Sequence, residues 1–312
     1  MRAVRAAVAG LAGVLLAVSL LAFLDRFTWF FELFDFFRLQ YLFLAFALAL
    51  AATLLRQPWV TGLALGTAVV NLVVLLLAWR GPYRPPLLPG PPLTVLLSNV
   101  EFGNSDFAAV IATIVRARPD VVGLTELSPA WSRALKATLR TYPYRRVAIL
   151  PSAYGIGLFS RLPMRAHVVH LPTGGPASVI GRIRLGTRTV TFVLTHPHTP
   201  FGTHAGGLHR RQFEALAREV PRLGPRVAVC GDLNTVPWSW PFRQLESAAQ
   251  LHDMHRGDPF EGSWPSWAWF LRVPIDNCLT GDGLAVVSHR TLAAVGSDHL
   301  PLLVQLASAR AG

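Results

Sequence analysis

Hydrophobic residues are distributed differently in the two parts of the chain. From Met1 to Trp79 the sequence is almost continuously apolar, and it contains three long apolar runs. The runs cover about residues 6–24, 39–55 and 59–79. Runs of this kind predict transmembrane helices, with the second a little short for the hydrocarbon core of a bilayer. Residues 25–38 mix Phe and Trp with charges, a pattern typical of a segment lying in the membrane interface.

The first apolar run has a second interpretation, as a cleavable signal peptide. Two more apolar runs follow it and no small-residue cleavage site stands out, so residues 1–80 predict a membrane domain with three transmembrane helices. The arginines near the N-terminus, together with Arg56, favour a cytoplasmic N-terminus and place the rest of the chain outside the cytoplasm. Arg80 and Arg84, just past the third run, argue against that orientation.

Beyond the membrane domain, the apolar residues form short runs. Residues 81–92 contain six prolines and predict a stiff, extended spacer. From residue 93 to residue 312 the runs are short and β-branched, and turns bound them, as in buried strands. Helical patterns stand between them at residues 107–117, 131–139 and 208–220. Residues 93–312 therefore predict one α/β domain.

Polar side chains stand at the ends of many of these predicted strands. They are Asn99, Glu126, His196, Asp232, Asn234, Asp276, Asp298 and His299. A single polar residue in such a place usually satisfies backbone groups in a turn. Eight of them, from strands far apart in the chain, predict strand ends that converge on one site. The acids supply hard oxygen ligands suited to Mg²⁺ or Mn²⁺.

Charge changes this picture only slightly. The formal net charge is +12, and the chain from Arg80 onward carries 24 basic and 14 acidic residues. Such an excess attracts phosphate-bearing partners or anionic lipid headgroups. However, Lys136 is the only lysine, and an Arg-, Ala- and Pro-rich composition also follows from genomic base composition. The charge alone therefore does not select a substrate.

The two cysteines, Cys230 and Cys278, both lie in apolar, strand-like runs. Two buried core thiols are the expectation, with a disulfide between them as the alternative. Because the chain has no CxxC pair, metal binding through sulfur is disfavoured.

The ordered set of polar motifs resembles the DNase I-like endonuclease/exonuclease/phosphatase superfamily. The motifs are Ser98-Asn99-Val100-Glu101, Thr125-Glu126, residues 155–163, Thr195-His196, Gly231-Asp232-Leu233-Asn234, Ile275-Asp276 and Gly296-Ser297-Asp298-His299-Leu300-Pro301. They span almost all of residues 93–307. The resemblance implies a four-layer α/β sandwich, with two mixed β-sheets face to face and helices outside, preceded here by three transmembrane helices.

The resemblance also implies a metal site. Glu126 would be the principal ligand, and Asn99 and Asp298 would complete the surroundings of the metal directly or through water. Mg²⁺ or Mn²⁺ is the implied cofactor. Glu101 stands where some relatives have a second metal-site acid, and a solvated residue is an equally good interpretation of it.

The same resemblance makes a second group of residues catalytic. They are His196, Asp232, Asn234, Asp276 and His299. Asp276 would fix the tautomer of His299, and either His299 or Asp232 would activate water. Asn234 would donate hydrogen bonds to the phosphoryl oxygens. His196 would stabilise the phosphate or assist the leaving group, with His198 as its competitor.

Two groups of side chains remain without a defined role. The aromatic residues of the loop before Asp276 form either a satellite core or an apolar rim that meets a membrane or a lipid tail; they are Trp264, Trp267, Trp269 and Phe270. Four further histidines are expected on loops or helix surfaces: His204, His209, His252 and His255.

Three membrane spans followed by this domain also resemble the VanJ-type teicoplanin resistance proteins. This narrower resemblance implies a metal-dependent phosphohydrolase at the outer face of the cell membrane, acting on an undecaprenyl-type lipid phosphate or pyrophosphate. The lipid bilayer and the lipid-linked substrate are then the expected partners, and no protein partner is implied. The alternative is a membrane-tethered nuclease, which the positive charge of the domain and much of the superfamily favour.

Overall fold

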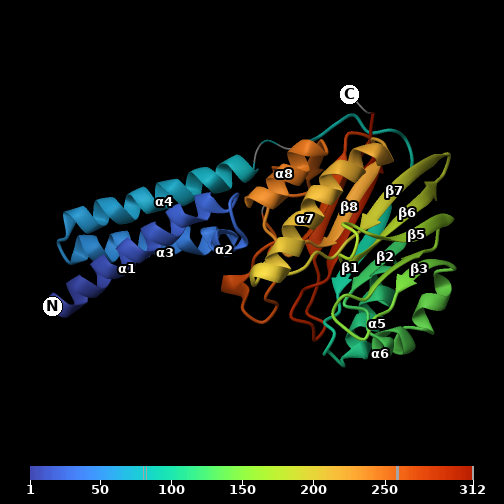
Figure 1. Cartoon of the computed structure of the whole chain (residues 1–312), viewed down its shortest axis with the longest axis horizontal. Coiled ribbons are helices and arrows are strands. Elements are labelled where there is room, and N and C mark those ends of the chain that lie inside the picture. The colour runs from blue at the N-terminus through green and yellow to red at the C-terminus, as the bar shows by residue number, and fades with distance from the viewer. Residues whose placement is uncertain (80, 82, 258–259, 311–312) are drawn as a thin grey trace.

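The computed structural model describes residues 1–79, 81, 83–257 and 260–310. An elongated helical bundle forms one end of the molecule and a β-sandwich the other (Figure 1). Six residues of the predicted regions fall outside this part of the chain: Arg80, which ends the predicted membrane domain, Pro82 in the predicted spacer, and residues 258–259 and 311–312 of the predicted catalytic domain.

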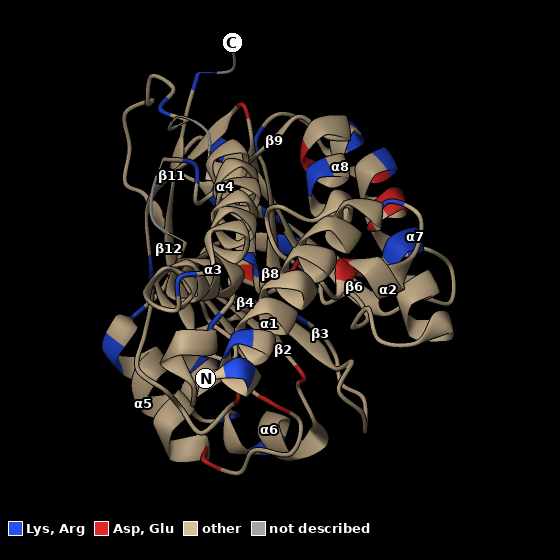
Figure 2. Cartoon of the chain, turned by 90° about the vertical axis from the view of Figure 1, so that its left-hand side faces the viewer, with Lys and Arg blue, Asp and Glu red and all other residues tan. Residues whose placement is uncertain are grey.

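The bundle consists of three long helices. They are α1 (Arg2–Leu21), α3 (Arg38–Leu54) and α4 (Pro58–Trp79), with a 3-10 turn (Ala22–Leu24) and the short α2 (Trp29–Glu32) after α1. Seen end-on in Figure 2, these helices are almost uncharged. Their outward side chains are apolar and strongly exposed, such as Phe43, Leu54 and Trp59, which is 91% exposed. A surface of this kind is favourable in lipid and costly in water.

Two of the three predicted spans have the length and composition needed to cross a membrane. Arg2–Leu24 has 23 residues and Pro58–Trp79 has 22. Helix α3, with 17 residues, is shorter than the roughly 20 residues that a full crossing needs. Three spans therefore remain a prediction, while two apolar helices of spanning length are a finding.

Two mixed six-stranded sheets form the sandwich. The first has the order β11-β12-β1-β2-β4-β3 and the second the order β5-β6-β7-β8-β10-β9. The first sheet contains β1 (Leu93–Asn99), β2 (Val121–Thr125), β3 (Tyr144–Ala148), β4 (Ile156–Ser160), β11 (Leu284–Thr291) and β12 (Leu302–Ser308). The second contains β5 (Met164–His170), β6 (Ala177–Leu185), β7 (Arg188–Leu194), β8 (Val227–Asp232), β9 (Leu251–Asp253) and β10 (Asp276–Gly281).

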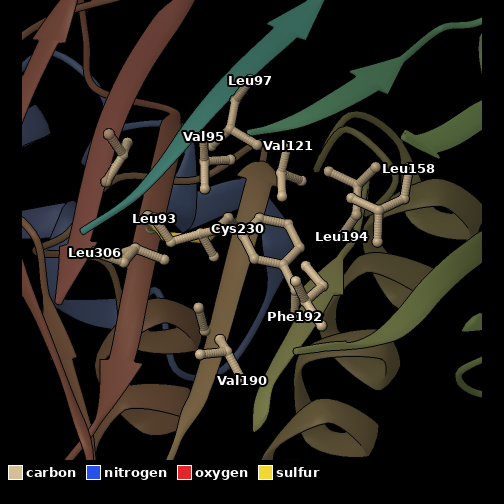
Figure 3. Packing of buried hydrophobic residues seen from close by; sticks show 14 of the residues in the cluster. Leu93, Val95, Leu97, Val121, Leu158, Val190, Phe192, Leu194, Cys230 and Leu306 are labelled. Carbon is tan, nitrogen blue, oxygen red and sulfur yellow. A yellow bond between two sulfur atoms is a disulfide. The ribbon is translucent and has the colours of Figure 1, made fainter. Parts of the chain in front are cut away.

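Helices cover the outer faces of both sheets, which completes the four layers that the sequence resemblance implied. Helices α5 (Phe107–Ala117) and α6 (Pro129–Ala134) pack on the first sheet. Helices α7 (Thr203–Glu219) and α8 (Trp240–Ala248) pack on the second. Short 3-10 turns occur at Thr138–Thr141, Val220–Leu223 and Trp269–Leu271. Between the sheets, side chains such as Val95, Leu158 and Phe192 form a hydrophobic core (Figure 3).

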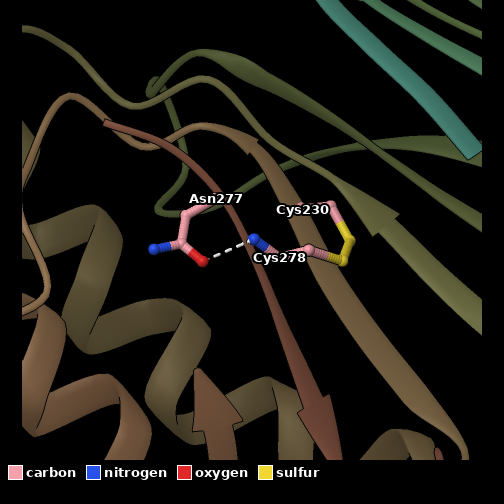
Figure 4. The surroundings of a disulfide bond; sticks show 3 residues. All are labelled: Cys230, Asn277 and Cys278. Atoms are coloured by element: carbon pink, nitrogen blue, oxygen red, sulfur yellow. Dashed lines mark hydrogen bonds between the residues drawn. A yellow bond between two sulfur atoms is a disulfide. The ribbon is translucent and has the colours of Figure 1, made fainter. Parts of the chain in front are cut away.

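The two cysteines form a disulfide, so the expectation of two free thiols was wrong. Cys230 of β8 and Cys278 of β10 are bonded (Figure 4). The reason lies in the strand register, because β8 and β10 are antiparallel neighbours and Cys230 stands directly opposite Cys278. The residues are 48 positions apart in the chain, and nothing in the local sequence pattern reveals that pairing.

The Pro-rich segment after the bundle lies along the sandwich. Leu87 pairs with Ala309 in an isolated bridge, and the Leu88 amide donates to the Ser308 carbonyl at 2.8 Å. The ring of Tyr83 stacks on His252, with 3.4 Å between ring centroids. The described residues of this spacer are therefore fixed to the domain by contacts at several points.

Gly231, just before the end of β8, has no room for a side chain. Its φ is +143°, and a Cβ atom would lie 2.1 Å from the Thr195 carbonyl oxygen. Because that oxygen belongs to the backbone just after β7, which cannot easily move, we expect Gly231→Ala to destabilise the fold by about 3 kcal/mol. In thermal unfolding this corresponds to a loss of roughly 6–12 °C in Tm. Gly103→Ala is the control, since no atom lies within 4 Å of its Cβ position; an equal loss there would contradict the prediction.

Candidate active site

The topology brings the predicted polar residues to one edge of the sandwich. Strands β1 and β2 are parallel, so Asn99 and Glu126, at their carboxyl ends, lie side by side. Strands β7 and β8 are also parallel, which places His196 beside Asp232. Asp276 was expected at the end of a strand, but it begins β10. It still reaches this edge, because β10 is antiparallel to β8 and Asp276 pairs with Asp232.

An amide bridges two of the carboxylates. The Asn99 side-chain nitrogen donates to Glu126 Oε1 and to Asp232 Oδ2, each at 3.0 Å. The Asn99 amide oxygen accepts from the Glu101 backbone N–H at 2.9 Å, which fixes the orientation of the amide. The Phe102 amide donates to Glu126 Oε2 at 2.8 Å. Asn99 therefore links the ends of the two sheets and holds Glu126 in place.

A histidine lies between two buried carboxylates. His299 Nδ1 is 2.7 Å from Asp276 Oδ2, and His299 Nε2 is 3.6 Å from Asp232 Oδ2. Burial alone would lower the pKa of His299, but the charges of Asp276 and Asp232 outweigh it and raise the pKa to about 10. At neutral pH the ring is therefore an imidazolium, and it sits beside an ionised Asp232.

Asp232 is the most heavily contacted acid of the group. Besides Asn99 and His299, it faces His196 Nε2 at 3.3 Å and accepts the Asn234 backbone N–H at 2.9 Å. Burial would raise the pKa of Asp232, whereas His299, His196 and Asn99 together hold it well below its usual value. Burial has the opposite effect on a histidine and lowers the pKa of His196, but the hydrogen bond and the charge of Asp232 outweigh it and raise the pKa of His196 above its ordinary value.

Asn234 follows in a left-handed turn. Its φ is +51°, a conformation that asparagine tolerates better than most residues. Its side-chain nitrogen donates to the Pro197 carbonyl at 3.0 Å, which ties the turn after β8 to the turn after β7. Within the described part of the chain, the buried Nδ1 of His196 has no hydrogen-bond partner.

These side chains open onto a cavity of about 210 Å³. Its polar wall is formed by Glu126, His196, Asp232, Asn234, Asp298 and His299. Its apolar wall includes Phe201 and Trp264 and, from the segment between α2 and α3, Phe36. The structure thus gathers all of the predicted residues except Asn99 and Asp276 directly at one cavity, and those two contact its members from behind.

The donor set of this cavity fits a divalent metal ion. Glu126, Asp232 and Asp298 present carboxylate oxygens to the same space, which is the ligand type that Mg²⁺ and Mn²⁺ prefer. The Asp298 side chain is 40% exposed, and Trp264 Nε1 donates to its Oδ2 at 3.0 Å. A more compact group, Asp232–Asp276–His299, has ligand atoms within 4.8 Å of one another. Since its acids already pair with the imidazolium, the Glu126 side of the cavity suits a metal better.

The sequence does not assign a role to Tyr154, His209 or His255, of which Tyr154 lies beside the cavity. Tyr154 lines it, and its hydroxyl lies 2.5 Å from His198 Nδ1. His209, expected on a surface, is fully buried in α7. His255 is also fully buried, beside Asp253. No local signal marks Tyr154 or His209, because Tyr154 contacts His198 and His209 contacts Glu32, and both partners are distant in the sequence.

We expect Asp276→Asn to lower the pKa of His299, because the Asp276 charge is the largest influence that raises it. The alkaline limb of the pH–rate profile should then move down by at least about one pH unit. The imidazolium also stabilises the fold below the ordinary histidine pKa, and this contribution disappears as the pH rises through about 10. Phosphoester hydrolysis from pH 6 to 11, with unfolding at the same pH values, measures both effects. An unchanged alkaline limb would contradict this electrostatic account.

Comparison with known families identifies the domain. The model of the Endonuclease/Exonuclease/phosphatase family matches residues 96–299, which is more than half of the chain. The chain belongs to this family. Its members are hydrolases that act on phosphoester bonds, and they generally depend on a divalent metal ion, in agreement with the donor set of the cavity.

Individual proteins give more distant similarities. The inositol phosphosphingolipids phospholipase C of Saccharomyces cerevisiae is 27% identical in an alignment of 159 positions that covers 43% of this chain. The match spans only 33% of that relative's length. An endonuclease/exonuclease/phosphatase from Beutenbergia cavernae has a TM-score of 0.57 at 23% identity, covering 71% of this chain and 72% of that one. TDP2 of D. rerio, complexed with a single-strand DNA product, has a TM-score of 0.57 at 15% identity, covering 69% and 98%. These structures share the fold.

Proposed function

We propose that this protein is a membrane-anchored, metal-dependent phosphohydrolase whose substrate is a lipid-linked phosphate or pyrophosphate of the undecaprenyl type. The observation that carries the proposal is the place of the cavity. Its polar wall holds the acids and histidines, while Phe36 in its apolar wall comes from the segment that connects the helices of the apolar bundle. A substrate with a phosphate head and a lipid tail matches both walls.

An exposed aromatic rim next to the cavity supports a lipid partner. Trp267, Trp269 and Phe270 are 77%, 76% and 60% exposed. Gln40 of α3 donates to the Phe270 carbonyl at 3.3 Å, so the rim is attached to the sandwich end of the bundle. Trp and Phe at that level are typical of a membrane interface. Of the two interpretations of this loop, the exposed side chains favour the apolar rim over a satellite core.

Each polar residue has a proposed role in attack of water on phosphorus. Glu126 and Asp298 would hold Mg²⁺ or Mn²⁺, which when bound neutralises charge on the phosphoryl oxygens. Asp232, ionised and buried, would accept the proton of the attacking water. His299 as the imidazolium and Asn234 would stabilise the negative charge that develops on the phosphoryl oxygens. His196 would stand near the leaving group.

The disulfide supports a location outside the cytoplasm. Disulfides persist in oxidising compartments and are rare in the cytosol. A cytoplasmic N-terminus and three spans, with α3 tilted or the bilayer thinned around it, would place the Cys230–Cys278 bond on that side. A cysteine introduced at the exposed Arg84 should then react with an impermeant maleimide added to intact cells. Labelling only after lysis would overturn this orientation.

A membrane-tethered nuclease is the second candidate, and one observation favours it. A larger cavity, of about 740 Å³, is lined by Arg165, Arg182, Arg184 and Arg226 and would suit a polyanion. However, it lies beside the start of β7, at Thr189 and Thr191, whereas the candidate site follows the end of β7. A strand bound there would run along the far end of the sandwich, so the lipid substrate ranks first.

The two candidates can be compared in a single preparation. The full-length protein, purified in detergent, is incubated with undecaprenyl pyrophosphate or with plasmid DNA, each with Mg²⁺ or with EDTA. We expect Mg²⁺-dependent phosphate release from the lipid and no nicking of the plasmid. Nicking without turnover of the lipid would reject the lipid substrate in favour of the nuclease. Turnover that persists in EDTA would reject the metal-dependent mechanism.

A further inference from the structure

The segment between α1 and α3 is packed into the sandwich domain. The Trp240 amide donates to Asp25 Oδ2 at 2.6 Å, and Trp238 Nε1 donates to the Asp35 carbonyl at 2.6 Å. Trp29 packs tightly against Gly206 of α7: a Cβ atom added to Gly206 would lie 2.4 Å from the Trp29 Cβ. A segment that only linked two transmembrane helices would not need such contacts.

Glu32, in the middle of this segment, is a fully buried carboxylate. Its Oε1 accepts a hydrogen bond from the Thr235 hydroxyl at 2.7 Å and lies 3.2 Å from His209 Nε2. Thr235 and His209 are themselves fully buried and belong to the sandwich domain. Burying a carboxylate is costly unless its partners compensate for the lost water. The bundle thus inserts an acid into the domain and has it hydrogen-bonded there.

His209 turns this contact into a connection with the site. Its Nδ1 lies 2.6 Å from the His198 carbonyl, and because a carbonyl only accepts, Nδ1 must carry a proton. For His209 Nε2 and Glu32 Oε1, 3.2 Å apart, to form a hydrogen bond, one of these two atoms must also carry a proton. His209 is thereby held at both ends, with the bundle on one side and the turn after β7 on the other.

The contacts close a ring around the back of the candidate site. Asn234 donates to the Pro197 carbonyl, next to the His198 carbonyl that His209 contacts. Thr235, which immediately follows Asn234, donates to Glu32. The ring fixes the two turns that carry Asn234 and His196 relative to each other. Its only member from outside the sandwich domain is Glu32.

We propose that Glu32 is a positioning residue of the active site, and that the helical bundle is therefore part of the catalytic apparatus as well as an anchor. Phe36, four residues on, lines the cavity itself and shows how near this segment comes to the reacting groups. The inference rests on the proposed function for its kinetic readout, while its structural readout is independent of any activity.

Three variants of the full-length protein test the inference. Glu32→Ala removes the carboxylate that Thr235 and His209 share. Glu32→Gln can keep the ring. One N–H of the new amide can donate to a neutral His209 and the other to the hydroxyl oxygen of Thr235. The Thr235 hydroxyl then donates to Ser239, 2.6 Å away. Thr235→Val keeps the shape of the side chain and removes the hydrogen bonds of the hydroxyl with Glu32 and Ser239. Glu219→Ala is the control, since that exposed acid at the end of α7 forms an ion pair with the exposed Arg222.

The kinetic readout is hydrolysis of p-nitrophenyl phosphate and bis(p-nitrophenyl) phosphate, and the structural readout is hydrogen–deuterium exchange of residues 194–200 and 231–237. We expect Glu32→Ala to lower kcat by about 10–100-fold with little change in KM, and to accelerate exchange in both segments. Thr235→Val should change kcat and the exchange rates in the same direction as Glu32→Ala, but by a smaller amount. Glu32→Gln and Glu219→Ala should stay close to the wild type.

Unchanged exchange and kcat in Glu32→Ala would overturn the inference. A Glu32→Gln variant whose kcat falls as far as that of Glu32→Ala would overturn it as well. If Glu32→Ala does not fold, the test passes to Thr235→Val: unchanged exchange and kcat in that variant would overturn the inference. A wild-type protein that hydrolyses neither probe nor the lipid would refute the proposed function instead, and the exchange of the two segments would still confirm or reject the positioning role.

Discussion

Replacing His299 with asparagine is expected to lower kcat for phosphoester hydrolysis by about 10²–10⁴-fold. Asparagine keeps a hydrogen-bonding group opposite Asp276 but removes the positive charge that lies 2.7 Å from Asp276 and 3.6 Å from Asp232. The negative charge that develops on the phosphoryl oxygens would then lose a nearby buried cation, and Asp232 would lose the largest single influence that lowers its pKa, the charge of His299. Steady-state kinetics with the full-length protein at pH 7 measure the loss.

His167→Asn is the matched control, because His167 is an exposed residue of the edge strand β5. It should leave kcat unchanged. If His299→Asn kept more than about a tenth of the wild-type kcat, the imidazolium would not contribute the transition-state stabilisation assigned to it.

Replacing Glu126 with glutamine is expected to lower hydrolysis by at least about 100-fold at low Mg²⁺ and to raise the metal concentration needed for half-maximal rate. Glutamine can keep a hydrogen bond from the Phe102 amide through its oxygen, yet it removes the negative charge that faces the cavity. Rates measured across a titration of Mg²⁺ or Mn²⁺ separate weakened metal binding from a loss of chemistry.

The comparison for this variant is Glu219→Gln, which alters an exposed acid far from the cavity. Its metal dependence should match that of the wild type. A Glu126→Gln protein with unaltered metal dependence would show that the ion is held elsewhere, with the compact Asp232–Asp276–His299 group as the next place to examine.

The sequence predicts the centre of the sandwich well and its edges poorly. Strands β1 and β8 are buried on both faces, so they occur as continuous apolar runs with clear ends. The edge strands β3 and β5 were not predicted, because half-exposed strands such as Tyr144–Ala148 interleave arginines with apolar residues. Helix α8 was also missed; its sequence begins with Trp-Pro and mixes polar with apolar residues.

The candidate site could be predicted for a physical reason. Polar residues that end buried strands are conspicuous against an apolar run, and the topology of parallel and antiparallel neighbours gathers them at one edge. Contacts across layers have no such signature. The Glu32–Thr235 hydrogen bond joins residues 203 positions apart, and the Cys230–Cys278 bond depends on a register that only the paired strands reveal.

The attachment of the Pro-rich segment has a consequence for how substrates are found. Its contacts, from the Tyr83 stack to the bridge at Leu87, hold the described part of the connection against the sandwich. With the bundle in a bilayer, the mouth of the cavity would stay at one height above the membrane plane. Substrates would then arrive by two-dimensional diffusion past a stationary opening. For the lipid substrate proposed above, the turnover rate should then follow its surface density in the membrane rather than its bulk concentration.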